Sequence, residues 1–355
     1  MPGRQVVLMY HSVSSTDQPA VLGSFPVPLP RFIHQLDAAR AAGWQFGRLG
    51  DLRRPTGRDT LYVTGDDGTV DWVRNVMPWC QRAGIPTHTA IITGPWQTPP
   101  VYPVAHRLQA LLALSECADA APTRALPQPS LTPEQIAYID RVYAYETDLR
   151  RRYLKGACNV VFDDAAARAL LGPPDETESQ LMAERFAAPA EYRRYEVGPA
   201  SLPAAGRSPH SAGTEARPTY AEFGAHTVSH RAFDGDAAGY LRDEITPCVT
   251  AIRAAGLACS TYFTLPMRPR FPATVEQLVP ALQAAGFAGV LDGGGEWDRR
   301  SFIIPRIDAK NVEQHLGLPA WNDTGAKAAN AAQRWPSLEP CASETNSEPL
   351  GVARA

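Results

Sequence analysis

The 355-residue chain lacks several features that would place it in a specialised class of protein. No segment approaches the roughly 20 consecutive apolar residues that a membrane-spanning helix requires. The formal net charge is −3, so the chain has neither the basic excess of a nucleic-acid-binding protein nor a polyacidic tail. The N-terminal apolar run, residues 6–10, is shorter than a signal-peptide core, and no small-residue cleavage site follows it. We therefore expect a cytoplasmic protein without a membrane span or a nucleic-acid partner.

Cysteine is scarce, and no Cys-x-x-Cys pair occurs. In a chain of this size without a secretion signal, we interpret the scattered cysteines as free and mostly buried thiols. They are Cys80, Cys117, Cys158, Cys248, Cys259 and Cys341. The remaining composition, 44% hydrophobic and 20% charged, is that of an ordinary globular protein with one large domain or two smaller ones.

Short apolar runs alternate with helical periodicity in both the first and the last third of the chain. This alternation is typical of parallel α/β folds, in which functional residues gather at the C-terminal ends of the strands. Strands are expected at 5–10, 61–64, 86–93, 222–225, 259–265, 287–291 and 301–304. Helices are expected between them at 31–42, 70–83, 239–255 and 274–285.

The intervening segment, residues 96–218, has mainly helical patterns and ends in a stretch rich in Pro, Ser, Ala and Gly. We expect a strand only at 159–162 and a mobile loop at 198–218. The chain then divides into a first α/β half (1–95), a helical insertion (96–218), a second α/β half (219–318) and a disordered tail (319–355). Helices of the insertion are expected at 102–118, 132–154, 163–171 and 176–188.

Two adjacent aspartates, Asp66 and Asp67, follow the second expected strand. Paired carboxylates repel each other and lose hydration when buried, so a bound metal ion would stabilise them. The alternative is an Asx-type turn, because Asp-Asp-Gly is favourable turn chemistry by itself.

His226 and His230 stand four residues apart, after another expected strand. Thr227 occupies the position where a zincin has its catalytic glutamate, which excludes that class. Two histidines with one carboxylate would form a three-ligand metal site with open positions, and the second aspartate could then take a proton from water. The alternative is a chance pair on the surface.

These motifs resemble those of the polysaccharide deacetylases of the NodB-homology superfamily. Residues 64–68, Thr-Gly-Asp-Asp-Gly, are similar to the family's first motif, Thr-Phe-Asp-Asp-Gly, and residues 226–230 match the second, His-Ser/Thr-x-x-His. The opening residues 7–13 resemble the poly-N-acetylglucosamine deacetylase branch, which segments 284–287 and 305–308 also fit. Residues 263–266 stand where the third motif is found.

The resemblance implies a deformed (β/α) barrel of about seven strands with a long helical insertion. It implies a divalent ion, most often Zn²⁺ with Co²⁺ or Ni²⁺ as alternatives, held by Asp67, His226 and His230. Asp66 would be the catalytic base in the removal of an N-acetyl group from an amino sugar or a sugar-containing conjugate, releasing acetate and an amine. Pro266 and Trp297 are the candidate substrate-binding residues.

The sequence departs from the family pattern in several places. Gly65 replaces the aromatic residue of the first motif, which we expect to loosen the packing or to make room for substrate. Thr264 stands where the third motif has a base-orienting arginine, and the acid-bearing Leu-x-x-His motif is missing. His11 is the better candidate for the general acid, unless it is structural, and His315 is expected on the surface. Structural or solvent roles are expected for the remaining histidines, His34, His88, His106 and His210.

Three functional hypotheses remain open from the sequence. The first is the N-deacetylase, and the second is a hydrolase of another C–N bond, such as a cyclic imide, a ureide or a formamide. The third is a catalytically inactive binding or scaffold protein. The partner is a small-molecule or carbohydrate substrate, and a homo-oligomer is possible. The insertion would serve as a lid, as a dimer surface or only as packing on the outside.

Overall fold

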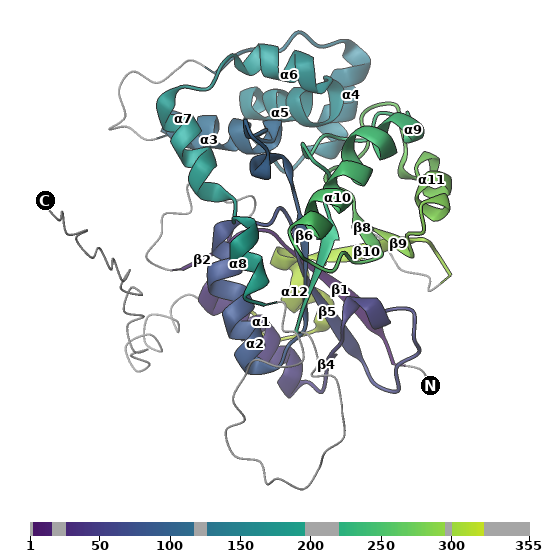
Figure 1. Cartoon of the computed structure of the whole chain (residues 1–355). Coiled ribbons are helices and arrows are strands. Elements are labelled where there is room, and N and C mark those ends of the chain that lie inside the picture. Colours follow the sequence, from purple (N-terminus) through teal and green to yellow (C-terminus); the bar gives the residue numbers. More distant parts are fainter. Residues whose placement is uncertain (1–2, 16–25, 117–125, 196–219, 295–299, 323–355) are drawn as a thin grey trace, which may run out of the picture. The chain divides into compact units, whose positions relative to one another are not determined.

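The computed structural model describes residues 3–15, 26–116, 126–195, 220–294 and 300–322 (Figure 1). The chain divides into two compact units, Met1–Pro319 and Ala320–Ala355. The loop predicted at 198–218 and most of the predicted tail lie outside the described residues. Within the described part, no helix has the length and apolar character needed to cross a membrane.

The first unit is built around a nearly closed barrel of parallel strands in the order β7-β6-β5-β1-β10-β9-β8. A bridge between Phe223 and Cys259 links β7 to the segment before β8 and so brings the two edges of the sheet together. The predicted deformed (β/α) barrel is thereby confirmed. Its strands are β1 (Gln5–Tyr10), β5 (Thr60–Gly65), β6 (Thr87–Ile91), β7 (Ala221–Ala225), β8 (Tyr262–Thr264), β9 (Gly289–Gly293) and β10 (Ile303–Asp308).

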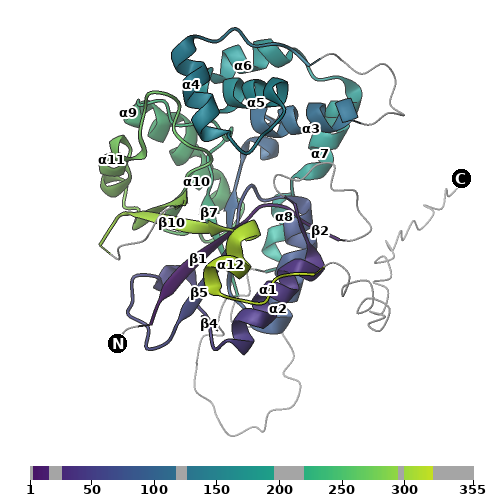
Figure 2. The same cartoon turned by 180° about the vertical axis from the view of Figure 1, so that it is seen from behind.

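Helices cover the outside of the barrel and bury its apolar surface (Figure 2). Helix α1 (Leu29–Ala41), for example, buries Phe32, Leu36 and Ala39, which recur at helical spacing. The other outer helices are α2 (Met77–Ala83), α9 (Ala237–Tyr240), α10 (Thr246–Ala254), α11 (Val279–Ala284) and α12 (Val312–Leu316). Two π-helical turns, η3 (Trp72–Val76) and η6 (Leu241–Ile245), lead into α2 and α10.

Short elements complete the barrel unit. Strand β4 (Gln45–Phe46) pairs with β5, and β2 (Val13–Ser14) pairs with β3 (Val27–Pro28). The 3-10 turns are η2 (Leu49–Asp51), η4 (Gly94–Trp96), η7 (Val275–Gln277) and η8 (Ala309–Asn311). The described cysteines, Cys80, Cys158, Cys248 and Cys259, are free thiols, as expected.

The described part of the segment between β6 and β7 is mainly helical, and most of these helices gather at one end of the barrel (Figures 1 and 2). Thr132 begins one of them with a capping box to Gln135. The segment comprises α3 (Val104–Glu116), α4 (Pro133–Val142), α5 (Leu149–Gly156), η5 (Ala157–Val161), α6 (Asp164–Leu171), α7 (Glu176–Arg185) and α8 (Pro189–Arg193).

The strand predicted at 159–162 is wrong, because these residues largely form the π-helical turn η5 that continues α5. Cys158 packs into one apolar cluster with Leu108, whereas Val160 packs into another with Ile139. Burial on two helix-facing sides overrides the β-propensity of the two valines.

Candidate metal centre

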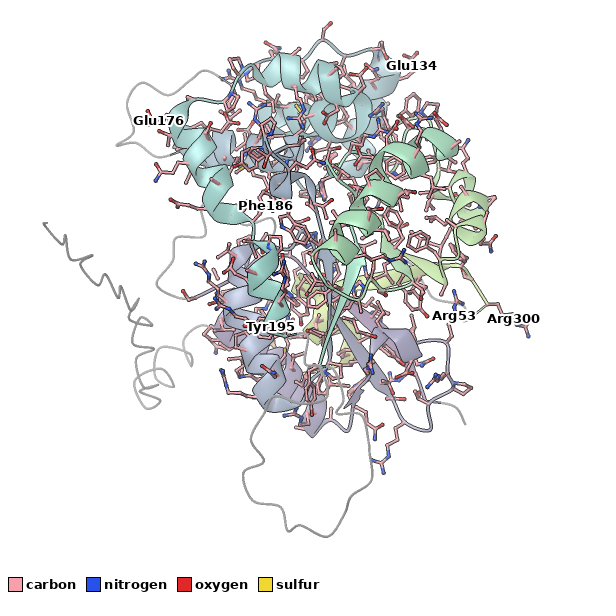
Figure 3. All side chains as sticks on the ribbon, in the orientation of Figure 1. Arg53, Glu134, Glu176, Phe186, Tyr195 and Arg300 are labelled. Carbon is pink, nitrogen blue, oxygen red and sulfur yellow. The ribbon has the colours of Figure 1, made fainter. Side chains whose placement is uncertain are left out.

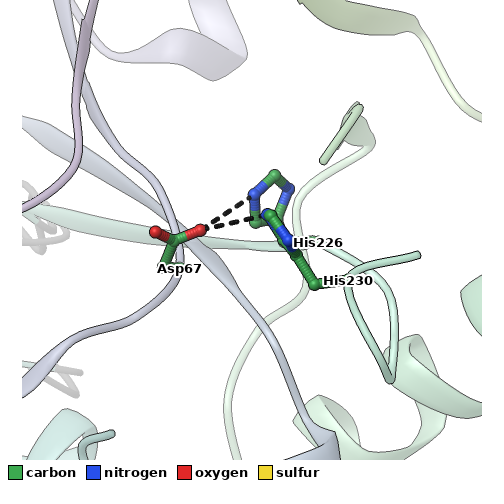
Figure 4. Close-up of side chains that lie close together, drawn as sticks. All are labelled: Asp67, His226 and His230. Atoms are coloured by element: carbon green, nitrogen blue, oxygen red, sulfur yellow. Dashed lines mark ion pairs between the residues drawn. The ribbon is translucent and has the colours of Figure 1, made fainter. Parts of the chain in front are cut away.

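Asp67, His226 and His230 come together at the C-terminal ends of two barrel strands that are separated by one other strand (Figure 4). Asp67 follows β5, and the two histidines follow β7. All three are buried, and their ligand atoms lie within 4.8 Å of one another. Oδ1 of Asp67 is 3.4 Å from Nε2 of His226 and 3.3 Å from Nε2 of His230. The two expected motifs therefore lie close together in space, although the insertion separates them in the sequence.

The spacing and the protonation pattern of this cluster fit a small divalent ion. Bonds of about 2.0–2.1 Å to a tetrahedral ion place neighbouring ligand atoms about 3.3 Å apart. Both oxygens of Asp67 and Nε2 of His226 are buried without a hydrogen-bond partner among the described residues. Nδ1 of His226 lies 2.9 Å from the carbonyl oxygen of Thr264, which makes Nδ1 the protonated nitrogen and leaves Nε2 with its lone pair.

The local electrostatics keep these donors in the forms that bind metal. Burial acts to raise the pKa of Asp67, but the surrounding imidazoles outweigh it and hold that pKa well below its ordinary value. Burial lowers the pKa of His230. The cluster therefore presents an ionised carboxylate with a neutral imidazole, the states from which a metal is bound.

The backbone around the cluster is strained. Asp67, Thr227 and His230 have φ angles of 71°, 70° and 60°, in the left-handed region that non-glycine residues rarely adopt. Glu244 on η6 supports the second loop by accepting hydrogen bonds from the backbone N–H groups of Val228 and Ser229 at 3.0 and 2.9 Å. Strain held by surrounding contacts is typical of functional loops.

The second aspartate, Asp66, is paired with an arginine that the sequence analysis did not assign. Arg306 on β10 contacts both carboxylate oxygens of Asp66, at 2.7 and 2.8 Å, and both side chains are 2% exposed. Burial acts to raise the pKa of Asp66, but the charge of Arg306 outweighs it, so the net pKa is below its ordinary value. An arginine on β10, and not a residue at the position of Thr264, thus pairs with this carboxylate.

Gly65, the departure within the first motif, does not loosen the packing as expected. A Cβ atom at Gly65 would lie 2.2 Å from the indole ring of Trp72, which is fully buried. The indole N–H donates to Oγ1 of Thr89 at 2.9 Å, which fixes the ring in place. The space that an aromatic side chain would need is therefore filled by Trp72, and no room is left there for substrate.

The remaining predicted site residues have different positions. Nε2 of His11, directly after β1, lies 3.9 Å from Oδ2 of Asp66, and its side chain is 18% exposed. Pro266 is half-buried in the loop after β8, and Trp297 lies outside the described residues. His315 on α12 is exposed, as expected.

His106 was expected to be structural or solvated, but it lies at the metal centre. Its ring is 1% exposed, and its Nε2 is 3.3 Å from Oδ2 of Asp67. Nε of Arg185 donates a short hydrogen bond to Nδ1 of the same ring. Burial and the charge of Arg185 lower the pKa of His106 to about 3. The only signal in the sequence was the pair His106-Arg107 within an apolar helix, because no motif covers the insertion.

A recess opens beside His230 between the barrel and the insertion. Asn159 and Val104 line it from the insertion, while Met267 and Arg270 line it from the loop after β8. Oδ1 of Asn159 and Nε of Arg270 are buried without a partner among the described residues. The insertion thus contributes polar atoms next to the metal centre.

No protein-family model and no curated protein matches the chain. Its structure is similar to that of the Streptococcus pyogenes deacetylase PplD in complex with acetate, at 12% identity and a TM-score of 0.46, covering 89% of this chain and 99% of that one. IcaB from Ammonifex degensii is 14% identical with a TM-score of 0.49, covering 89% and 97%. A de-N-acetylase from Aggregatibacter actinomycetemcomitans is 11% identical with a TM-score of 0.46, covering 88% and 99%.

Proposed function

We propose that the chain is a metal-dependent hydrolase that removes an acetyl group from the nitrogen of an amino sugar or a sugar-containing conjugate. The observation that carries this proposal is the buried cluster of Asp67, His226 and His230 beside the separate, ion-paired carboxylate of Asp66. Amide hydrolysis needs both an activated water and a group that takes its proton, and these two sets of residues divide the tasks.

Asp67, His226 and His230 would hold the ion, with Zn²⁺ as the first choice and Co²⁺ or Ni²⁺ as alternatives. When bound, such an ion polarises the amide carbonyl and lowers the pKa of water at the site. The imidazole of His226 faces the cluster with its Nε2, because its Nδ1 donates a hydrogen bond to the backbone carbonyl of Thr264.

Asp66 accepts the proton of the attacking water, and the water oxygen forms the new bond to the carbonyl carbon. Arg306 keeps Asp66 ionised and oriented through its two contacts at 2.7 and 2.8 Å. His11 then gives a proton to the leaving nitrogen as the C–N bond breaks. The products are acetate and the free amine.

The narrow recess beside His230 is the proposed side of approach for the substrate, and residues of the insertion line part of it. Asn159 and Arg270 offer an acceptor and a donor for polar groups of a sugar. Pro266 in the loop after β8 and Trp297 are further contacts of the proposed substrate.

The test is acetate release from a panel of N-acetylated amino sugars by zinc-loaded protein, with formamides, ureides and cyclic imides as competing substrates. We expect Asp66→Asn to abolish turnover while zinc content is retained, and His11→Ala to lower kcat by about 10²–10⁴-fold. His315→Ala, a change of an exposed histidine on α12, is the matched control and should leave the rate unchanged.

Two outcomes would contradict the proposal. Turnover of only a competing substrate would assign the chain to another C–N bond, and zinc-loaded protein without any turnover would favour a binding or scaffold role.

A further inference from the structure

His106 reaches the metal centre although the proposed reaction makes no use of it. It stands on α3 of the insertion, with its Nε2 3.3 Å from Oδ2 of Asp67. The other oxygen of that carboxylate, Oδ1, faces His226 and His230 at 3.4 and 3.3 Å. Three imidazoles therefore surround one carboxylate, on two different oxygens.

The tautomers distinguish His106 from a metal ligand. A guanidinium has no acceptor atom, so the contact between Nε of Arg185 and Nδ1 of His106 makes Nδ1 the acceptor. A neutral imidazole that accepts at Nδ1 carries its proton on Nε2 and offers no lone pair there. His226 has the opposite arrangement, since its Nδ1 donates to the carbonyl of Thr264. His106 thus turns a protonated Nε2 toward Oδ2 at 3.3 Å, although neither atom has a hydrogen-bond partner among the described residues, and His226 turns its Nε2 toward Oδ1.

The insertion holds His106 on two packed helices. Arg107, the next residue on α3, contacts Glu178 of α7 at 2.5 Å, and both are nearly inaccessible to solvent. Arg185 ends the same helix α7, so the two charged contacts join the same pair of helices. The ring of Phe186 lies 4.9 Å from that of His106, and Figure 3 shows Phe186 where the chain leaves α7 toward the barrel. A group held in this way keeps a fixed direction, as preorganised sites require.

We propose that His106 is a positioning residue for the metal ligand Asp67. With the ion bound, its Nε2–H would donate to Oδ2 and leave Oδ1 as the oxygen directed to the ion, while Arg185 fixes the tautomer. The inference rests on the metal site of the proposed function, but it does not depend on the substrate. It makes the insertion a part of the metal centre in addition to a wall of the recess.

The first test compares the zinc affinity of purified variants by chelator competition. His106→Ala should weaken zinc binding by about 10–100-fold, the usual effect of removing a group that orients a ligand. His106→Gln should stay close to the wild type, because its amide can accept from Arg185 and donate to Asp67. His315→Ala is the control and should not change the affinity.

The second test asks whether Arg185 acts through His106. Arg185→Leu should weaken zinc binding in the wild-type background and have no further effect in the His106→Ala background. In the zinc-loaded wild type, ¹⁵N NMR of the histidine rings should report His106 with a protonated Nε2 and an unprotonated Nδ1, assigned by its loss in His106→Gln.

Three results would overturn the inference. They are an unchanged zinc affinity in folded His106→Ala, an equal loss in His106→Gln and His106→Ala, or an Nδ1–H tautomer on His106. If His106→Ala does not fold, the zinc affinity of Arg185→Leu and the NMR spectrum of the wild type test the inference instead. A protein that binds zinc as described but releases no acetate would contradict the proposed function and leave this inference standing.

Discussion

At Gly65 the indole ring of Trp72 fills the space that a side chain would otherwise occupy. The indole of Trp72 lies where the first atom of a side chain at Gly65 would stand, at 2.2 Å. The two positions therefore form one packing unit beside the aspartates, and neither can be understood from the motif alone.

We expect Gly65→Phe to destabilise the fold by about 3 kcal/mol or more, because a buried core that is already filled must be overpacked. Combining it with Trp72→Ala should cost about 1–3 kcal/mol less than the sum of the two single changes, since one ring would replace the other. Denaturant unfolding of the four proteins measures this coupling.

Gly57→Phe is the matched control, because a Cβ atom at Gly57 meets no atom within 4 Å. This substitution should lower the unfolding free energy only slightly. Strict additivity of Gly65→Phe and Trp72→Ala would show that the two positions do not share the space.

At the scale of elements, a buried carboxylate joins the first helix to the last. Glu313 on α12 accepts from Nε and Nη2 of Arg31 on α1, at 2.8 and 3.0 Å. Gln35, also on α1, donates to Glu313 at 2.9 Å and to the carbonyl of Ala309 at 2.7 Å. These contacts hold α1 and α12 together, although the two helices are far apart in the sequence.

Glu313→Gln should lower the stability by about 1.5–3 kcal/mol at neutral pH, the usual contribution of hydrogen bonds to a charged group. Burial acts to raise the pKa of Glu313, but the hydrogen bonds from Arg31 and Gln35 outweigh it, and the net pKa is below the ordinary 4.5. This stabilisation is therefore complete above pH 4.5 and is lost as the pH falls through the folded-state value.

The difference in unfolding free energy between wild type and Glu313→Gln should accordingly be constant at neutral pH and shrink in acid. Glu276→Gln, a change of an exposed glutamate, serves as the control. If the difference in unfolding free energy is as large in acid as at pH 7, the negative charge of Glu313 does not cause the stabilisation.

The sequence predicts helices and strands correctly where hydrophobic periodicity and turn residues agree. It predicts the candidate metal centre because the family motifs stand at the ends of strands. The convergence of Asp67, His226 and His230 was predicted in this way, and so were most of the barrel strands. Arg306 was missed because the apolar run ends at Ile304, whereas β10 continues to Asp308. His106 was missed because only the packing of α3 against α7 brings it to Asp67, and local patterns carry no information on such contacts.

At the scale of the whole molecule, the metal centre joins the two α/β halves of the barrel. Asp67 belongs to the first half, whereas His226 and His230 belong to the second. An ion bound by all three would bind the folded chain only, and its binding free energy would add to the stability of the fold.

Zinc at about 100 times its Kd should therefore stabilise the fold by about 2.7 kcal/mol, measured as a rise in Tm on adding zinc to metal-free protein. Asp67→Ala should abolish this rise, because it removes the carboxylate that faces both imidazoles. The exposed change His315→Ala should retain it. An equal rise in Asp67→Ala would mean that zinc binds elsewhere.

The pairing of β1 with β10 also determines when the ion pair of Asp66 with Arg306 can form during synthesis. Leu8 pairs with Ile307, so nearly the whole barrel unit must leave the ribosome before this pair of strands can form. Until then Arg306 is absent, and Asp66 would be a buried carboxylate without its cation. Contacts between such distant parts of a chain form slowly, because a long loop must close first. The ion pair of Asp66 with Arg306 is therefore among the last contacts that a nascent chain can make.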